Sequence, residues 1–184
     1  MSERIRDASR TRAKIIRAAE QVFSAKSYAE ATLREITDLA GVNLALARRY
    51  YGSKLGLYEA VLDQAMATSL IVGLEKGTFG KALVASFFHP PPEHVHSLPI
   101  LIGGAADPEA RSVALKLLHD RILQPLAAWL GGAAAEEKAA QIMMITSGFF
   151  LFRSTLPLGP LQGEGSLPLQ LWLESVLQGL VQAG

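Results

Sequence analysis

Apolar side chains recur every three or four residues along most of this chain, and this spacing predicts an all-α protein. The first stripe predicts a helix over residues 9–25. Its members are Ile15, Ile16, Ala19, Val22 and Phe23. A second helix is expected to begin at Thr32 and run to Ala40, because Thr32 and Glu35 have the spacing of a capping box. We find no convincing strand in the pattern.

A tight turn is predicted directly after the second helix. Gly41 can adopt the positive φ angle that such a turn requires, and Val42 can pack back onto a small core. Asn43 can then cap a third helix that runs through Tyr51. Two short helices joined by a glycine-bearing turn are typical of a helix-turn-helix, whose second helix enters the major groove of DNA.

The rest of the chain is also expected to be helical. We predict one long helix from Lys54 to about Gly73 and another from Asp107, which Pro125 should kink or end. Residues 134–156 are apolar on nearly every side, so this helix should be buried all round. A last helix should open at residues 166–168, after a surface loop that spans residues 157–168.

Composition describes a globular protein and removes several other classes. The chain has 184 residues, of which 49% are hydrophobic and 19% charged, and it contains no cysteine, which excludes disulfide and thiolate chemistry. Residues 1–20 carry charges throughout, so no signal peptide is expected there. The most apolar run, residues 139–152, has 14 residues and is too short to span a bilayer. We therefore expect a cytoplasmic protein without a membrane partner.

Positive charge is concentrated in the first part of the chain. Residues 1–54 hold 11 Lys and Arg against 6 Asp and Glu, whereas residues 55–184 hold 7 against 11. This asymmetry suggests that the first segment meets a polyanion. Arg48 and Arg49 can bind phosphates or guanine, while Tyr50 and Lys54 offer further phosphate donors. The alternative is a solvated amphipathic helix whose tyrosines belong to the core. We expect such a core position only for Tyr51.

Residues 31–58, ATLREITDLAGVNLALARRYYGSKLGLY, resemble the DNA-binding signature of the TetR/AcrR family of bacterial transcriptional regulators. The matching positions are Thr32, Ile36, Gly41, Val42, Tyr51, Ser53, Lys54 and Leu57. The resemblance implies a homodimer with a DNA-binding domain at residues 1–54 and a helical ligand-binding and dimerisation domain at residues 55–184. It also implies that Thr32 and Lys54 contact the DNA backbone. The chain departs from the family pattern with Arg48 in place of tyrosine and Tyr50 in place of histidine.

Together, motif and resemblance give a set of expected contacts with an operator of double-stranded DNA. The set comprises Thr32, Arg34, Asn43, Leu44, Ala45, Arg48, Arg49, Tyr50 and Lys54. Asn43 and Ala45 are short enough to let the helix approach base edges. We expect Arg48 to contact the backbone and Arg49 to lie nearer the bases.

Two C-terminal helices are more apolar than a monomer of this length requires, which indicates a partner subunit. Small residues in the segment 134–156 permit close approach, so that this helix, the last helix and their symmetry mates would form a four-helix bundle. The alternative is that both helices pack inside one subunit. The predicted interface residues are Ala140, Met144, Gly148, Leu151, Leu173 and Leu177.

Methionine and aromatic side chains in the C-terminal part would suit a pocket for a small apolar effector, although any core has a similar composition. The predicted lining is Met66, Leu70, His119, Ile122, Met143 and Phe150. His119 is either a polar contact in this pocket or a helix-surface histidine. His89, His94 and His96 lie close together in sequence, but their spacing matches no closed zinc set, so no metal or cofactor is expected.

No serine, aspartate or glutamate forms a recognisable nucleophile motif with a histidine, so we do not expect an enzyme. We expect a ligand-responsive repressor that an apolar effector releases from a palindromic operator. Two alternatives stay open: a constitutive DNA-binding dimer without an effector, and a carrier or enzyme that uses the same cavity.

Overall fold

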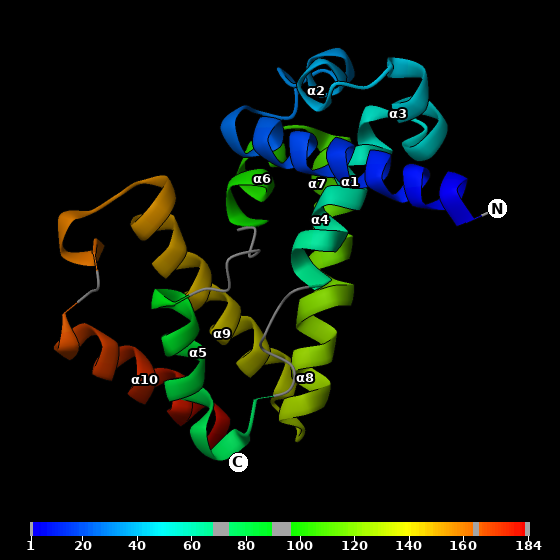
Figure 1. The fold of residues 1–184 in the computed structure, drawn as a ribbon. Helices are drawn as coiled ribbons and strands as arrows, with labels where there is room; N and C mark the ends of the chain where they lie inside the picture. The colour runs from blue at the N-terminus through cyan, green and yellow to red at the C-terminus, as the bar shows by residue number, and fades with distance from the viewer. Residues whose placement is uncertain (1, 68–73, 90–96, 164–165, 183–184) are drawn as a thin grey trace. The chain divides into compact units, whose positions relative to one another are not determined.

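The computed structural model describes residues 2–67, 74–89, 97–163 and 166–182, and these form only helices and connecting turns (Figure 1). The chain divides into two compact units. The first contains residues up to 67 together with residues 95–117, and the second contains residues 68–94 and 118–184. The unit that holds the helix-turn-helix therefore extends beyond residue 54, because two later segments pack into it.

The first unit is built around α1 (Ser2–Ala25), which packs against α2 (Leu33–Ala40), α4 (Lys54–Ala67) and α6 (Ser97–Gly104). It also contains α3 (Leu44–Tyr51) and most of α7 (Pro108–Leu118). The predicted apolar stripe of α1 is confirmed as core: each of its five members is at most 6% exposed. Helix α1 begins before the predicted Ser9, while residues 68–73, where α4 was expected to end, lie outside the described residues.

An aromatic cluster joins α6 to the other helices of the first unit. Phe23, Tyr28 and Tyr58 contact one another through their rings, with centroids 5.1–6.1 Å apart. The Tyr58 hydroxyl donates to the carbonyl of Ile100, 3.2 Å away, and burial raises the pKa of Tyr58 to about 12, so it stays protonated. A Cβ on Gly104 would lie 2.1 Å from that hydroxyl, so only glycine fits at this approach.

The second unit packs α5 (Phe79–Phe88) on α10 (Leu167–Gln182) and α8 (Gln124–Leu130) on α9 (Ala135–Phe150). The unit also contains short helical turns: η1 (Lys76–Thr78), η2 (His119–Leu123), η3 (Leu151–Thr155) and η4 (Gly159–Leu161). Its core is formed by Phe79, Leu83, Val84, Phe87, Leu126, Leu130, Ala139, Ile142, Phe149, Leu173 and Leu177. Helices α5 and α10 approach closely at Gly80, where a Cβ would lie 2.2 Å from the carbonyl oxygen of Glu174.

The expected interruption near Pro125 takes the form of a π-turn. Regular α-helix ends at Leu118, and across η2 the Gln124 amide donates to the carbonyl of His119, five residues earlier. Pro125 has no N–H, and its ring would crowd the carbonyl of Arg121 in a regular helix. The wider turn removes that conflict, and the helix continues to Leu130.

The expectation that residues 134–156 are buried all round is wrong for this subunit. Met144 is 69% exposed and Phe152 is 39% exposed, whereas Ala139, Ile142 and Phe149 are buried. The neighbouring helices α8 and α10 cover only one side of α9, so its other side faces away from the core. Residues 157–163 lie at the surface, as predicted for the loop.

Candidate nucleic-acid interface

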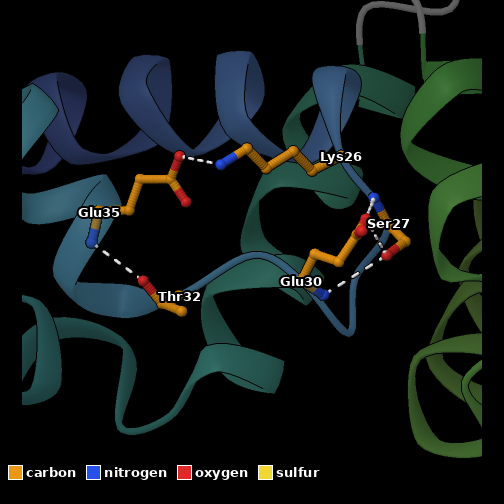
Figure 2. A network of polar contacts seen from close by, with 5 residues as sticks. All are labelled: Lys26, Ser27, Glu30, Thr32 and Glu35. Atoms are coloured by element: carbon orange, nitrogen blue, oxygen red, sulfur yellow. Dashed lines mark hydrogen bonds and ion pairs between the residues drawn. The ribbon is translucent and has the colours of Figure 1, made fainter.

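Thr32 caps the start of helix α2 and forms half of the predicted capping box. Thr32 has an extended backbone, and its hydroxyl oxygen accepts a hydrogen bond from the Glu35 amide at 3.1 Å. The Glu35 carboxylate does not return to Thr32 but accepts a hydrogen bond from Lys26 (Figure 2). The side chain of Glu35 therefore ties α2 to the end of α1.

A second polar contact fixes the segment between α1 and α2. The Ser27 hydroxyl and amide both donate to the Glu30 carboxylate, at 2.6 and 3.2 Å (Figure 2). These hydrogen bonds, with a smaller contribution from the nearby Lys26 charge, hold the pKa of Glu30 below its ordinary value. The approach to the helix-turn-helix is thus an ordered turn.

The predicted turn between the two helices is confirmed. Gly41 has a φ angle of 65°, its amide donates to the carbonyl of Asp38, and the Val42 amide donates to that of Thr37. This pair of hydrogen bonds is a Schellman motif, which satisfies the last carbonyls of α2. Asn43 then accepts a hydrogen bond from the Ala45 amide at 2.8 Å and caps α3 as predicted.

The expected DNA-contacting residues all lie on α2, on α3, at their caps or at the start of α4. The exposed members are Thr32, Arg34, Asn43, Ala45, Arg48 and Arg49. Leu44, Tyr50 and Lys54 are half-buried. Arg48 and Arg49 occupy the last turn of α3, where their positive charges interact favourably with the negative end of the helix dipole.

Lys54 is held inside the subunit. Its ammonium donates to the carbonyls of Tyr28 and Ala31, at 2.8 and 3.1 Å, and lies 4.2 Å from the centroid of the Tyr28 ring. An ammonium has three N–H donors, so at most one is left for a phosphate. The backbone contact that the resemblance implies for Lys54 therefore competes with an internal role.

Arg12, which the sequence did not single out as a contact, lies beside α3. Its guanidinium carbon is 4.9 Å from the centroid of the Tyr50 ring, and its carbonyl accepts a hydrogen bond from Tyr51 at 3.3 Å. Burial raises the pKa of Tyr51, so this hydroxyl remains a donor. The two partners are 39 residues apart in the chain, and no local pattern indicates such a pairing.

The predicted pocket residues are spread over both units. Met66 belongs to the first unit, Ile122, Met143 and Phe150 belong to the second, and Leu70 lies outside the described residues. The His119 ring nitrogens lie 2.8 Å from the Asp120 carboxylate and 3.3 Å from the Gln124 amide nitrogen, and its side chain is about half exposed. Its contacts thus match the helix-surface alternative.

Two of the predicted interface residues lie in the core of the second unit. Leu173 and Leu177 are 2% and 0% exposed within a single chain, because they face α5 and form part of the core. Ala140 and Met144 are exposed, whereas Gly148 and Leu151 are half-buried. The exposed apolar side chains of α10 are instead Leu167, Leu171 and Trp172.

The described residues contain no group of three side chains able to hold a metal ion. Of the histidines considered for a metal, His89 is exposed, while His94 and His96 lie outside the described residues. Within the described ranges, no helix has the length and apolar character needed to cross a membrane.

Comparison with known protein families matches both parts of the chain to the same family. Residues 15–61 match the bacterial regulatory proteins of the tetR family, and residues 77–181 match the Tetracyclin repressor-like C-terminal domain. A search of curated proteins found no relative.

Solved structures share the fold. A protein of Mesorhizobium loti MAFF303099, assigned to the TetR family of transcriptional regulators, has a TM-score of 0.60 at 17% identity, over 96% of this chain and 95% of that one. A TetR-family regulator from Streptomyces coelicolor A3 gives 0.56 at 20% identity, over 94% and 95%. Another from Streptomyces coelicolor gives 0.58 at 22% identity, over 92% and 79%. This chain, with its capped helix-turn-helix, is a DNA-binding transcriptional regulator and belongs to the tetR family.

Proposed function

We propose that this regulator is a cytoplasmic homodimer that represses transcription from a palindromic operator and is released by a small apolar effector. The observation that carries the DNA-binding half is the exposed arginine pair on α3, a helix fixed at its start by Asn43 and at its preceding turn by Gly41. Charge-assisted hydrogen bonds from such arginines can reach both phosphates and guanines.

Exposed apolar side chains on α9 and α10 support the homodimer. Met144 is 69% exposed, Trp172 is 56% exposed and Leu171 is 54% exposed, within one unit of a single chain. Large apolar side chains gathered on neighbouring helices are typical of protein interfaces. A two-fold axis would also place two copies of α3 on successive half-sites, as a palindromic operator requires.

Release by an effector rests on the second unit. Half-buried Phe150 packs against the core, where the ring centroids of Phe87 and Phe149 are 5.2 Å apart, and Met143 is a half-buried residue of the same helix, α9. Flexible methionine and aromatic surfaces can rearrange around an apolar molecule. A ligand that prefers one dimer geometry shifts the population towards it, and release follows if that geometry no longer matches the groove spacing.

Electrophoretic mobility of the DNA upstream of the protein's own coding region tests the DNA-binding half. We expect a retarded complex that persists in excess unrelated competitor and disappears with the Arg48→Ala, Arg49→Ala double variant. Apolar compounds that raise the melting temperature are then added to the complex. Compounds that bind without releasing DNA would contradict the effector role, and a complex that competitor removes would contradict operator recognition.

A further inference from the structure

We propose that Arg12 is a DNA-phosphate contact outside the helix-turn-helix, and that Tyr50 is the positioning residue that holds it beside the recognition helix. This rests on the proposed DNA-binding function. It extends the DNA-binding surface from α2 and α3 to the N-terminal half of α1. It also gives Tyr50 a different role from a direct phosphate contact through its hydroxyl.

Arg12 is tied to α3 through both its backbone and its side chain. The Tyr51 hydroxyl donates to the Arg12 carbonyl at 3.3 Å, and the guanidinium lies 4.9 Å from the centre of the Tyr50 ring. The Tyr50 and Tyr51 rings meet edge to face, with their centroids 6.4 Å apart. The two neighbouring tyrosines therefore fix the place of one arginine from another helix.

The contact with Tyr50 leaves the N–H donors of the Arg12 guanidinium available. A cation–π interaction engages the positive charge and uses none of the five N–H donors. These donors form a planar fork that suits the oxygens of a phosphate. Arg12 is exposed, so a phosphate can approach it.

The position along α3 favours the phosphate backbone over the bases. Recognition helices direct their N-terminal residues to base edges, and their flanks meet sugar and phosphate. Tyr50 and Tyr51 are the last two residues of α3, so Arg12 lies at the flank of the helix. A cation held there neutralises a phosphate next to the groove that α3 enters.

Neighbouring cations in the first unit are engaged differently. Arg10 forms an ion pair with Asp7 at 3.3 Å, and Lys26 pairs with Glu35. Lys54 is bonded to two carbonyls. Arg10 is also two residues from Arg12, about 200° around the helix, and so points away from it. Arg10 is therefore a matched control: the same residue type on the same helix, with a different neighbourhood.

The test measures binding to a fluorescein-labelled duplex of arbitrary sequence, about 30 base pairs long, roughly three helical turns. A phosphate contact acts on any sequence, so no operator is needed. Anisotropy titrations over a salt series give the slope of log K against log salt for wild type and for Arg12→Ala, Arg12→Lys and Arg10→Ala.

We expect Arg12→Ala to make this slope shallower by about one unit per protomer, since each neutralised phosphate contributes about 0.9. Arg12→Lys should keep the slope and lose several-fold in affinity, because it keeps the charge without the planar fork. Arg10→Ala should leave the slope unchanged. Equal slopes for Arg12→Ala and wild type would overturn the proposal, and a wild-type protein that binds no DNA would overturn the DNA-binding function itself.

A second series tests the role of Tyr50. Tyr50→Phe keeps the ring and should bind like wild type, whereas Tyr50→Leu should lose several-fold in affinity. The Tyr50→Leu, Arg12→Ala double variant should bind no worse than Arg12→Ala alone, because the ring acts through the arginine. If Tyr50→Phe loses as much as Tyr50→Leu, the hydroxyl is the DNA contact and the positioning role is wrong.

Discussion

The ammonium of Lys54 lies 2.8 Å from the carbonyl oxygen of Tyr28 and 4.2 Å from the centre of the Tyr28 ring. Lys54 is the first residue of α4, and Tyr28 lies between α1 and α2. The Tyr28 amide in turn donates to the carbonyl of Gly103 in α6, at 2.8 Å. The segment around Tyr28 thus contacts α4 through Lys54 and α6 through Gly103.

Lys54→Ala is therefore expected to lower the free energy of unfolding by roughly 1–3 kcal/mol, because the partly buried carbonyls of Tyr28 and Ala31 lose a charged donor. Chemical denaturation measures this, and the slope of DNA affinity against salt should stay as in wild type. Lys14→Ala, which removes an exposed cation of α1, serves as the control and should melt like wild type. A Lys54→Ala protein of unchanged stability and shallower salt slope would instead assign the ammonium to a phosphate.

Gly41→Ala should destabilise the helix-turn-helix through its backbone alone. Gly41 has a φ angle of 65°, and an added Cβ would meet no atom within 4 Å, so the cost is that of the left-handed conformation, about 1–2 kcal/mol. Gly179 in α10 also has open space around it, but its φ angle is not positive. Gly179→Ala should stabilise the protein by about 0.5–1 kcal/mol. Equal effects of both variants in denaturant titrations would contradict the conformational argument.

Glu20→Gln should stabilise the protein at neutral pH. Glu20 is 9% exposed, one of its carboxylate oxygens has no hydrogen-bond partner, and burial raises its pKa against the opposing charge of Arg17. Because the pKa of Glu20 is raised in the folded state, the charged carboxylate lowers the stability of the protein at any pH above that pKa. Protonation removes this loss of stability as the pH falls towards the ordinary value of 4.5.

The gain in unfolding free energy from Glu20→Gln is expected to be about 1 kcal/mol at neutral pH and to vanish at acidic pH, where the native carboxyl is protonated. Denaturant titrations of both proteins over a pH series measure it. A destabilised Glu20→Gln protein at every pH would mean that the carboxylate makes a favourable contact that the amide cannot replace.

Trp172→Glu should prevent dimerisation. Trp172 is 56% exposed on α10, and a carboxylate there would be buried without a partner in the proposed interface. Leu115→Glu, at a 61% exposed position of α7 in the first unit, is the matched control. Sedimentation should give dimers for wild type and Leu115→Glu and monomers for Trp172→Glu. A Trp172→Glu dimer would move the interface away from this face.

Local sequence signals were sufficient for the helix-turn-helix and insufficient for its surroundings. Thr32, Gly41 and Asn43 were predictable because a cap or a turn depends on a few consecutive residues. The partners of Lys54 and Arg12 come from segments 26 and 39 residues away, and only the packing of α1 against the later helices brings them together. Similarly, the apolar spacing of α10 could not distinguish core Leu173 from exposed Trp172, since apolar residues occupy both sides of this helix.

We expect the two arginines of α3 to have different roles, with Arg48 contributing to affinity and Arg49 to base specificity. Arg48 and Arg49 are both exposed in its last turn and point about 100° apart, so at most one can face directly into the groove. We expect Arg49→Ala to relax preference at one base pair per half-site, by about 1–3 kcal/mol on the cognate operator. Arg48→Ala should instead lower affinity on cognate and scrambled DNA by similar factors. Titrations of both variants against an operator and its single-base substitutions measure this, with melting temperatures as the check on folding. A changed base ranking for Arg48→Ala, with an unchanged one for Arg49→Ala, would reverse the two roles.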